Sequence, residues 1–557
     1  MTNLHKSKPF VWCLFIVFCI VWFYMLGART LVPTDEGRYA EMAREMVATG
    51  DWITPRLNAI KYFEKPPLQI WMTALAFNAF GLGEWQARLW TGLCGFFGIV
   101  MTAYAGRKVF GARTGFAAGL VLASSLFWSA LGHINTLDMG LSGMMTLALT
   151  SLLIAQRRDA NASEQRNWML MCWAGMALSV MSKGLIGLVL PGAVLVIYSL
   201  LSRDWMIWKR LHLGLGLLVF FGITTPWFVL VSLKNPEFPH FFFIHEHFQR
   251  FSSKIHHREG PWYYFIPLLI LGILPWLGVL FQSIWASLRD NATGFQPKKL
   301  LIVWAGFIFI FFSISGSKLP SYILPIFPAL ALLIALHADA ITNKTWNFVA
   351  GLVASIGVAG VIIAGKIPQL ATETNEIAHY QSSLPWVNAA SIVLLTGGLL
   401  VLWWSKKDRD DMGQRAVITL AISGFLSVQL LMLGTEPYGR YRSGFPLVPA
   451  ITAELQADTK LYAVGLYDQT LPFYLRRTMT LVQHPDELEF GLKQEPSLWI
   501  PTRDAFIAEW RNGKKAVAIT RPEIFADFEK RGVPMRLITR DARRVVIAND
   551  VAPNKIN

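Results

Sequence analysis

Two carboxylates lie at the start of a helical segment, directly after the first long apolar run of the chain. The segment TDEGRYAEMA contains Asp35 and Glu36 next to Arg38. A positioned carboxylate can act as a general base or orient a nucleophile, so these residues are candidate catalytic groups. Asp35 could instead cap the helix that follows, because an aspartate at a helix start accepts backbone N–H bonds. The two roles are compatible, and the sequence leaves both open.

The segment YFEKPPL carries three more groups that could do chemistry. Its two prolines prevent a helix, so Tyr62, Glu64 and Lys65 are expected on a rigid extended turn. Asp138 follows in HINTLDMG, at the predicted start of a later helix. It could cap that helix, or it could serve with Asp35 as the second carboxylate of a pair, one activating a nucleophile and the other orienting it.

Cations and histidines occur in two further segments. Lys183 lies between two apolar runs in MSKGL, where a lysine can extend its stem along the membrane boundary. The segment PHFFFIHEHFQRF contains His245 and Arg250 among aromatic side chains. Its histidines could bind a divalent metal such as zinc, with Glu64 and His245 as the most suitable ligands, although no zinc-finger spacing is present. The alternative is an aromatic loop at the membrane interface.

The composition indicates what must position these groups. Of the 557 residues 54% are hydrophobic and only 16% are charged, which is far from the roughly 25% charge of a soluble domain. The formal net charge of +15 is distributed in short basic clusters between apolar runs. Such clusters are topology signals and contacts to anionic lipid of the bilayer, so nucleic acid is not expected as a partner. All four cysteines fall inside apolar runs, and no disulfide framework is implied.

The apolar runs predict an α-helical polytopic membrane protein with about thirteen transmembrane helices. Short loops rich in Lys and Arg fall on one side, which predicts a cytoplasmic N-terminus, provided that residues 68–83 lie at the interface and do not cross. The candidate spans are 10–28, 88–106, 114–132, 139–156, 167–182, 185–202, 211–233, 263–285, 300–315, 321–337, 346–365, 386–404 and 416–434.

This topology gathers the candidate groups on the outer face and divides the chain in two. Residues 1–434 form the predicted membrane domain, with a large outer loop at 29–87, in which Glu36 to Val47 are expected to lie as a helix along the membrane surface. Residues 450–557 are more charged and predict a small α/β domain on the same side. Its expected strand segments are KLYAVGLYD, KKAVAIT and MRLITRDARRVVIAND, and its helices are DAFIAEWRNG and PEIFADFEKRG.

Four motifs together resemble a known family. They are TDEGRYAEMAREM after the first helix, YFEKPPL some thirty residues later, the aspartate of HINTLDMG, and SGSKLPSYILP. They resemble the bacterial 4-amino-4-deoxy-L-arabinose lipid A transferases, relatives of the protein O-mannosyltransferases in the GT-C glycosyltransferase class. The resemblance implies transfer of the sugar from undecaprenyl phosphate to a lipid A phosphate on the periplasmic side of the bacterial inner membrane, a lipopolysaccharide modification tied to polymyxin resistance.

The resemblance also implies roles for individual residues. Asp35 matches the principal acidic position of the family, with Glu36 and Arg38 beside it, and Asp138 matches the second acidic position. Lys65 and Arg250 match the positions expected to hold the carrier phosphate. Further expected binding residues are Tyr322 as a hydroxyl donor and Lys183, Tyr62 and Tyr39 as lining of the cavity.

The physics of a lipid-linked donor agrees with this assignment. A polyprenyl phosphate holds its charge at the interface and its tail in hydrocarbon, so its enzyme needs cations just above a spanning bundle. Charge-assisted bonds to phosphate are strong, and they strengthen as the leaving phosphate gains charge in the transition state. The cations in suitable positions are Lys65, Lys183, Arg250 and Lys318.

The chemical role of Asp35 and Asp138 depends on the acceptor. A hydroxyl acceptor needs a general base, for which Asp35 is the candidate. A lipid A phosphate is already anionic, and in that case Asp35 and Asp138 could hold the amino group of the sugar or a metal. One alternative is a related GT-C transferase that modifies protein Ser/Thr or another envelope lipid. A transporter is a more distant alternative, because no repeat is present and the charges gather at one face.

Overall fold

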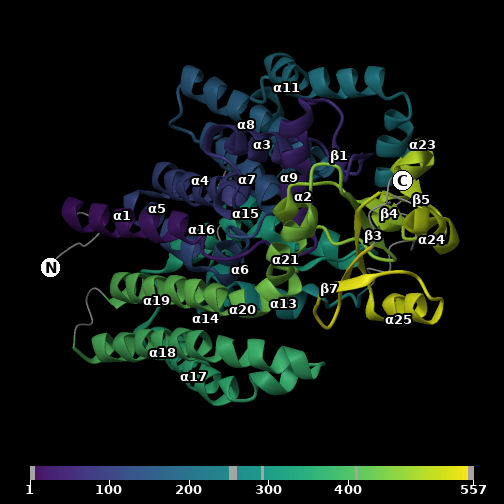
Figure 1. The fold of residues 1–557 in the computed structure, drawn as a ribbon. Coiled ribbons are helices and arrows are strands. Elements are labelled where there is room, and N and C mark those ends of the chain that lie inside the picture. The colour runs from purple at the N-terminus through teal and green to yellow at the C-terminus, as the bar shows by residue number, and fades with distance from the viewer. Residues whose placement is uncertain (1–6, 250–259, 290–293, 408–411, 513, 550–557) are drawn as a thin grey trace, which may run out of the picture.

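The computed structural model describes residues 7–249, 260–289, 294–407, 412–512 and 514–549, without the side chains of 246–249, 486 and 512. Long helices lie side by side in its larger part, and a small sheet with short helices lies at one end of them (Figure 1). The helices of the larger part are α1 (Lys8–Tyr24), α2 (Asp35–Thr49), α3 (Leu68–Phe80), α4 (Glu84–Phe110), α5 (Ala112–Ser124), α6 (Leu126–Leu131), α7 (Leu137–Ala155), α8 (Ala162–Lys183), α9 (Ile186–Ser202), α10 (Met206–Lys209), α11 (Leu213–Lys234), α13 (Phe265–Gly272), α14 (Leu277–Leu288), α15 (Pro297–Ile314), α16 (Phe327–His337), α17 (Asn343–Ala364), α18 (Ile377–Lys407), α19 (Met412–Gly434) and α20 (Glu436–Arg442).

Within the described residues, eight helices are long and apolar enough to cross a bilayer, or nine if the bent pair α13 and α14 forms one span. Three shorter apolar helices, α1, α3 and α9, add to these. The total of thirteen spans therefore stays a prediction. The helix α3 has 13 residues and is about 20 Å long, less than the roughly 30 Å of hydrocarbon. Its length agrees with the prediction that 68–83 does not cross.

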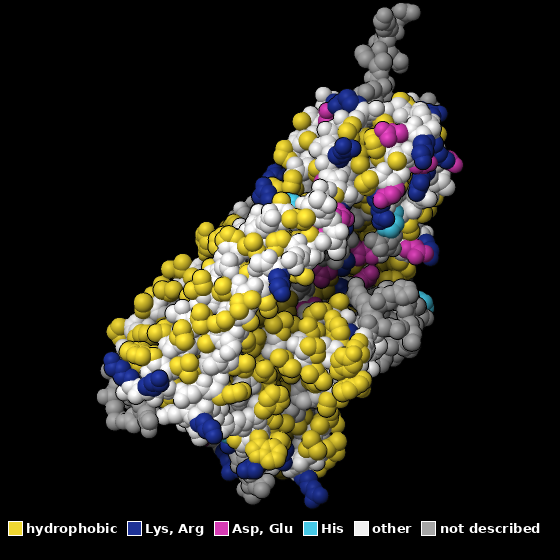
Figure 2. All heavy atoms as spheres, turned by 90° about the horizontal axis from the view of Figure 1, so that it is seen from below, with side chains coloured by type: hydrophobic (Ala, Val, Ile, Leu, Met, Phe, Trp, Pro, Cys, Tyr) yellow, Lys and Arg dark blue, Asp and Glu magenta, His cyan; other side chains and the backbone are white. Residues whose placement is uncertain are grey.

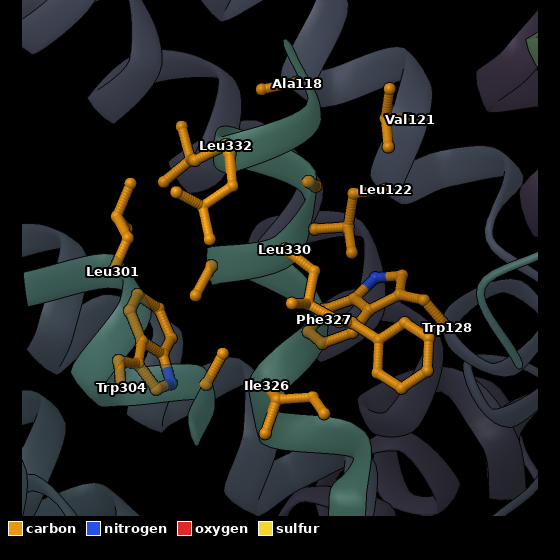
Figure 3. Close-up of a cluster of buried hydrophobic side chains, with 14 of the residues drawn as sticks. Ala118, Val121, Leu122, Trp128, Leu301, Trp304, Ile326, Phe327, Leu330 and Leu332 are labelled. Atoms are coloured by element: carbon orange, nitrogen blue, oxygen red, sulfur yellow. The ribbon is translucent and has the colours of Figure 1, made fainter. Parts of the chain in front are cut away.

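The core of the bundle is built around α16. Figure 3 shows side chains of α16 meeting those of α5, α6 and α15, with Phe327 and Trp128 close together. Trp304 of α15 is almost fully buried and donates its indole N–H to the main-chain oxygen of Pro325, at 2.9 Å. The short 3₁₀ helix η3 (Pro320–Ile326) therefore has a fixed position at the end of α15. This matters because η3 contributes to the candidate site.

The prediction of a surface helix after the first span is wrong in one respect. The helix α2 exists, but both of its faces are buried, including the charged side chains of Glu41, Arg44 and Glu45. Arg44 pairs with both oxygens of Glu41 at 2.6 Å, and Glu45 accepts the backbone N–H groups of residues 58 and 59. These residues join the small hairpin of β1 (Arg56–Leu57) and β2 (Ile60–Lys61). The polar face of α2 therefore packs against protein instead of water.

The C-terminal part forms one six-stranded sheet in the order β5-β4-β3-β6-β8-β7. The first four strands are parallel, and β8 and β7 are antiparallel additions at one edge. The predicted strands and helices are confirmed, whereas the short β4 and β5 had no clear signal. The elements are β3 (Lys460–Val464), β4 (Thr480–Val482), β5 (Trp499–Ile500), β6 (Ala516–Thr520), β7 (Arg536–Arg540), β8 (Val545–Ala548), α21 (Val448–Glu454), α22 (Leu471–Leu475), α23 (Glu489–Gln494), α24 (Arg503–Asn512) and α25 (Pro522–Lys530).

The sheet domain and the first outer loop share one apolar core. Leu57, Ile60 and Tyr62 from the loop pack in the same buried cluster as Leu461 and Leu481 from the sheet. The Cα of Gly37 on α2 lies so close to the segment after β3 that an added Cβ would be 2.6 Å from a main-chain oxygen of that segment. The C-terminal domain is therefore packed directly onto the first turn of α2.

Side-chain chemistry changes along the molecule. Apolar side chains cover the middle of the face shown in Figure 2, and the end away from the C-terminal domain shows Lys and Arg without acidic neighbours. At the other end acidic and basic side chains are mixed. The distribution fits a protein whose middle lies in hydrocarbon and whose basic loops lie on one side of it.

Candidate functional site

A cavity of about 540 Å³ lies where the first outer loop meets the ends of the spanning helices. Its polar wall comes from the start of α2, the turn before α3, the start of α7 and the end of α8, and η3 contributes Tyr322. The lining residues are Thr34, Asp35, Arg38, Tyr39, Glu64, Lys65, Leu137, Asp138, Leu141, Lys183, Leu185, Ile186, Val189, Phe311, Phe312, Ser315, Ser317, Leu319 and Tyr322.

Asp35 is the carboxylate most available to a ligand. It is the first residue of α2, after the N-cap residue Thr34, and no side-chain cap bond is present at this end. Its side chain is 39% exposed, and one of its oxygens accepts a bond from Arg38 at 3.1 Å. The structure therefore shows Asp35 facing the cavity rather than satisfying the backbone, and the helix start adds a favourable field for its negative charge.

Asp138 and Lys183 form an ion pair in the wall of the cavity. Asp138 belongs to the first turn of α7, and Lys183 is the last residue of α8, so the two helix ends bring them together. The ammonium group of Lys183 also lies 4.5 Å from the ring centre of Tyr322, a cation–π contact. The predicted second carboxylate thus has a fixed cationic partner, whereas Asp35 has only Arg38 beside it on its own helix.

The EKPPL turn contributes Glu64 and Lys65 to the same wall. The ammonium group of Lys65 donates to the main-chain oxygen of Glu64 at 2.8 Å, and both side chains are partly exposed. The turn leads directly into α3, because Pro67 is the N-cap residue of that helix. This geometry holds a cation at the cavity without burying its charge.

Glu36 is adjacent to Asp35 in the sequence, but it is buried and connects parts of the protein instead of facing the cavity. It is almost fully buried and forms a two-bond ion pair with Arg88 of α4, at 2.6 and 2.8 Å. It also accepts the backbone N–H groups of Val32 and Asn135. Burial alone raises the pKa of its carboxyl, but Arg88, the nearby Arg29 and the bond from Asn135 outweigh burial and hold the pKa below its usual value. Glu36 is outside the cavity and joins three segments that support it.

Tyr39 and Tyr62 lie on either side of the Arg38 guanidinium, whose carbon is 5.9 Å from each ring centre. Tyr39 lines the cavity, whereas Tyr62 lies behind it, and both are buried. Burial raises the pKa of both phenols well above 10, so they stay protonated and can only act as neutral hydrogen-bonding groups.

The remaining predicted residues lie elsewhere. Lys318 is buried and donates to the main-chain oxygens of Ser313 and Ser315, at 3.0 and 2.7 Å, so it holds the turn that lines the cavity. His245 is not among the lining residues and stacks on Phe241, with ring centres 5.1 Å apart. Arg250 lies outside the described residues, and the structure gives no account of it.

The proposed metal ligands, Glu64 and His245, both belong to the described residues. Across those residues no group of three His, Cys, Asp or Glu side chains is close enough together to hold a metal ion. Glu64 faces the cavity, and His245 belongs to the π-helical turn at residues 240–249. A divalent metal at Glu64 and His245 therefore stays a prediction, and no chemical step is assigned to it here.

A residue of the C-terminal domain also reaches the site. Glu487 accepts two bonds from the guanidinium of Arg38, at 2.5 and 3.2 Å, and Gln469 donates to the same carboxylate at 3.2 Å. Arg38 thus connects Glu487 to Asp35. Sequence reasoning missed Glu487 because it is 449 positions from Arg38 and lies in no motif. The only signal for this contact in the sequence is that Arg38 and Glu487 carry opposite charges.

The other half of the cavity is apolar. Aliphatic side chains of α7 and α9 and two phenylalanines of α15 face the charged groups across it. The lining residues of this half are Leu141, Leu185, Ile186, Val189, Phe311, Phe312 and Leu319. A molecule with a charged head and a hydrocarbon tail fits such a cavity better than a fully polar one does.

Comparison with known proteins places this geometry in a family. Residues 447–549 match the family model described as the aminoarabinose transferase C-terminal domain, and 64–229 match that of dolichyl-phosphate-mannose-protein mannosyltransferase. The fold superimposes on the crystal structure of ArnT from Cupriavidus metallidurans bound to undecaprenyl phosphate, with a TM-score of 0.93 and 41% identity, over 98% of this chain and 99% of that one. The chain belongs to the aminoarabinose transferase family.

Curated members of the aminoarabinose transferase family give the same result over shorter lengths. The undecaprenyl phosphate-alpha-4-amino-4-deoxy-L-arabinose arabinosyl transferase 1 of Sodalis glossinidius is 32% identical, over 62% of each chain. The protein of the same name from Proteus mirabilis is 29% identical, over 72% of each chain. The match to the first of these relatives thus spans about six tenths of its length. The expected fold, a polytopic helical membrane protein with a small C-terminal α/β domain, is confirmed.

Proposed function

We propose that the protein is a membrane glycosyltransferase that moves 4-amino-4-deoxy-L-arabinose from undecaprenyl phosphate to a phosphate group of lipid A. The observation that carries the proposal is the lining of the cavity, which combines the charged side chains of Asp35, Asp138, Lys65 and Lys183 with apolar side chains of α7, α9 and α15. The names of the curated relatives, and the undecaprenyl phosphate bound by the Cupriavidus protein, support the same donor.

The donor enters with its phosphate near the lysines and its tail along the apolar half. Lys65 has no burial cost to overcome, because its ammonium group is already at the cavity surface. Lys183 is held by Asp138 and adds a second positive charge close by. We assign Arg250 to the same phosphate on the resemblance of its motif. These charges give more stabilisation as the phosphate leaves than in the bound donor, which is the condition for catalysis.

The transfer exchanges one phosphate for another at the anomeric carbon of the sugar. An oxygen of the lipid A phosphate forms a bond to this carbon while the bond to the oxygen of undecaprenyl phosphate breaks. The leaving undecaprenyl phosphate keeps the electron pair, and the lysines of the cavity balance its new charge. The acceptor oxygen is already anionic, so no proton has to be removed. Asp35 is then free to hold the ammonium group of the sugar.

The finer location is also a proposal. We place the protein in the bacterial inner membrane with the N-terminus in the cytoplasm and with the cavity and C-terminal domain in the periplasm. The basic end seen in Figure 2 supports this orientation through the positive-inside rule. A cysteine introduced at Gly83, labelled by an impermeant reagent only from the cytoplasm, would contradict it.

The decisive experiment is the reaction itself. Purified protein is incubated with undecaprenyl-phosphate aminoarabinose and lipid A, and the products are identified by mass spectrometry. Addition of one aminoarabinose at a lipid A phosphate is expected. Transfer only to protein Ser/Thr or to another envelope lipid would replace the acceptor. Sugar accumulation in vesicles without any lipid product would replace the enzyme with a transporter.

The proposed role of Asp35 has its own test within this assay. A donor carrying arabinose without the amino group cannot form the ammonium contact. The parent protein should therefore prefer the amino sugar, and Asp35→Asn should lose most of this preference. If Asp35→Asn lowers the rate equally with both donors, Asp35 acts on the reaction rather than on the amino group.

A further inference from the structure

A second hollow, the outer groove, lies among the helices at the end of the bundle away from the candidate site. It has a volume of about 470 Å³ and is formed by α1, α4, α5 and α19. In Figure 1, α1 lies at the edge of the bundle with α4 and α5 on one side and α19 on the other. Its lining is apolar almost throughout and includes Phe10, Leu14, Phe18, Ala103, Leu120 and Leu426.

The groove runs along α1 from Phe10 to Val21, between this helix and α4, α5 and α19. Near the C-terminal end of α1, Trp22 is fully buried and donates its indole N–H to the main-chain oxygen of Gly92 at 3.0 Å. Toward the other end, Trp12 and Ile16 are 61% and 53% exposed. These two residues do not line the groove, and Ile20 and Tyr24 on the same face are 63% and 75% exposed, so this face of α1 points away from the bundle along the whole helix. In a bilayer, hydrocarbon chains are the molecules available to fill an apolar gap of this kind.

Basic side chains surround the mouth of the groove. Lys8 is three positions before the lining residue Val11 on α1, and Arg107 is four positions after Ala103 on α4. Residues three or four apart lie on the same face of a helix, so both cations continue the lining face by one turn. Both are exposed. Because α1 begins and α4 ends here, the two charges lie at the same end.

A third cation completes this end. Arg113 is three positions before the lining residue Phe116 on α5 and pairs with Asp339 at 2.7 Å. The ion pair neutralises this side of the mouth, so Lys8 and Arg107 supply the remaining positive charge. Lys108, the neighbour of Arg107, points away, because it contacts Tyr104 and pairs with Glu164 near α8.

The depth of the groove matches one leaflet. On α1 the lining runs from Phe10 to Val21, which is about 16 Å at roughly 1.5 Å per residue. Half of a hydrocarbon core of about 30 Å is about 15 Å. A lipid of the leaflet at the basic end therefore reaches the full groove with one chain, while its head group stays at the level of the cations.

We propose that the outer groove binds one acyl chain of an anionic glycerophospholipid, with its phosphate between Lys8 and Arg107. This site is separate from the donor cavity and lies at the opposite end of the bundle. The lipid chain fills the space between α1 and the helices α4, α5 and α19. It differs from a general lipid contact because a groove of the size of one acyl chain has two cations at its mouth, while the third cation, Arg113, is paired with Asp339.

Native mass spectrometry of the full chain in detergent tests the site with added phosphatidylglycerol and phosphatidylcholine. Phosphatidylglycerol should bind more tightly. A basic residue near the surface contributes about 1 kcal/mol toward anionic lipid, so Lys8→Gln and Arg107→Gln should each weaken its binding about fivefold. The matched control Lys108→Gln changes the adjacent residue and should stay within about twofold of the parent. Ala103→Phe fills the groove and should reduce binding of both lipids.

A phosphatidylglycerol with a photoreactive acyl chain supplies an independent readout that needs no variant. Its cross-links should fall on α1, α4, α5 or α19, and excess undecaprenyl phosphate should not remove them. Equal affinity for the two phospholipids, or equal losses in Arg107→Gln and Lys108→Gln, would overturn the head-group assignment. Cross-links spread evenly around the bundle, or displaced by undecaprenyl phosphate, would overturn the groove as a phospholipid site.

Discussion

Replacing Glu487 with glutamine tests whether the C-terminal domain affects catalysis at the cavity or only the stability of the protein. Glu487 lies in that domain and binds Arg38 through two bonds, and Arg38 in turn binds Asp35. Glutamine keeps the size of the side chain but removes its charge and turns one acceptor into a donor. Arg38 then loses its main partner and is free to move with Asp35. Glu487 is therefore expected to act as a positioning residue through Arg38.

The chain offers a matched control. Glu495 of the same domain binds Arg56 with distances of 3.0 Å, so Glu495→Gln removes a similar ion pair between the domain and the first loop. The side chains of Glu495 and Arg56 are 22% and 26% exposed, against 15% and 11% for Glu487 and Arg38. A bond to a charged group contributes about 1.5–3 kcal/mol, so Glu487→Gln should cost about 1–3 kcal/mol of stability and Glu495→Gln somewhat less.

Activity should separate the two variants far more than stability does. A displacement of about 1 Å at a catalytic group can cost about a hundredfold in rate. We expect Glu487→Gln to lower kcat about 10- to 100-fold with little change in the donor KM, and Glu495→Gln to stay within about twofold. Glu487→Asp should recover part of the loss because it keeps the charge. Equal activity in Glu487→Gln and Glu495→Gln, after correction for folded protein, would refute the positioning role.

Four further predictions concern the site and its support. Asp35→Asn should fold like the parent and lose about 10²–10⁴-fold in transfer, whereas Glu84→Gln, which changes a first-turn acid of α4 outside the cavity, should stay active; a fully active Asp35→Asn would return Asp35 to helix capping. Lys65→Ala and Arg250→Ala should raise the donor KM without unfolding the bundle, and unchanged donor titrations in both would contradict their contact with phosphate. Glu36→Gln breaks a buried ion pair and should cost about 3–5 kcal/mol at pH 7. Because the pKa of Glu36 is lowered by folding, its stabilisation is complete above the unfolded pKa of about 4.3 and is lost as the pH falls through the folded value; thermal melts should show a gap between parent and variant that narrows only below about pH 4. If Glu64 and His245 hold zinc, dialysis against a chelator should remove metal and activity together, and Glu64→Gln should lower the bound metal; full activity of metal-free protein would exclude a required ion.

The sequence predicted the individual elements better than it predicted their contacts. Apolar runs and loop charges identified the helices of the bundle, because length and hydrophobicity are local properties. Short runs of apolar residues likewise identified β3 and β6 in the C-terminal domain. The very short β4 and β5 are stabilised by neighbouring strands rather than by their own residues, so no local signal predicted them.

The sequence predicted the site residues that belong to local motifs and face the cavity. It did not predict the contacts between segments that are far apart in the chain. Asp35, Lys65 and Asp138 lie near the ends of apolar segments of the sequence, and the structure brings them to one cavity. Glu36 belongs to the same motif, but its pairing with Arg88 could not be read from spacing, because the two are 52 positions apart. The amphipathic pattern of α2 suggested a surface helix, because the domain that covers its polar face lies hundreds of residues later in the sequence.

The close packing of Gly37 against the segment after β3 has a consequence for biosynthesis. The first turn of α2 is made well before the residues that complete its surroundings, Gln469 and Glu487, because Glu487 follows Arg38 by 449 positions. A growing chain can therefore insert most of its helices before the cavity has its final wall. Chains that stop short of Glu487, whether by premature termination or by proteolysis, should remain in the membrane as inactive proteins. We therefore expect catalytic competence only after Glu487 has been made.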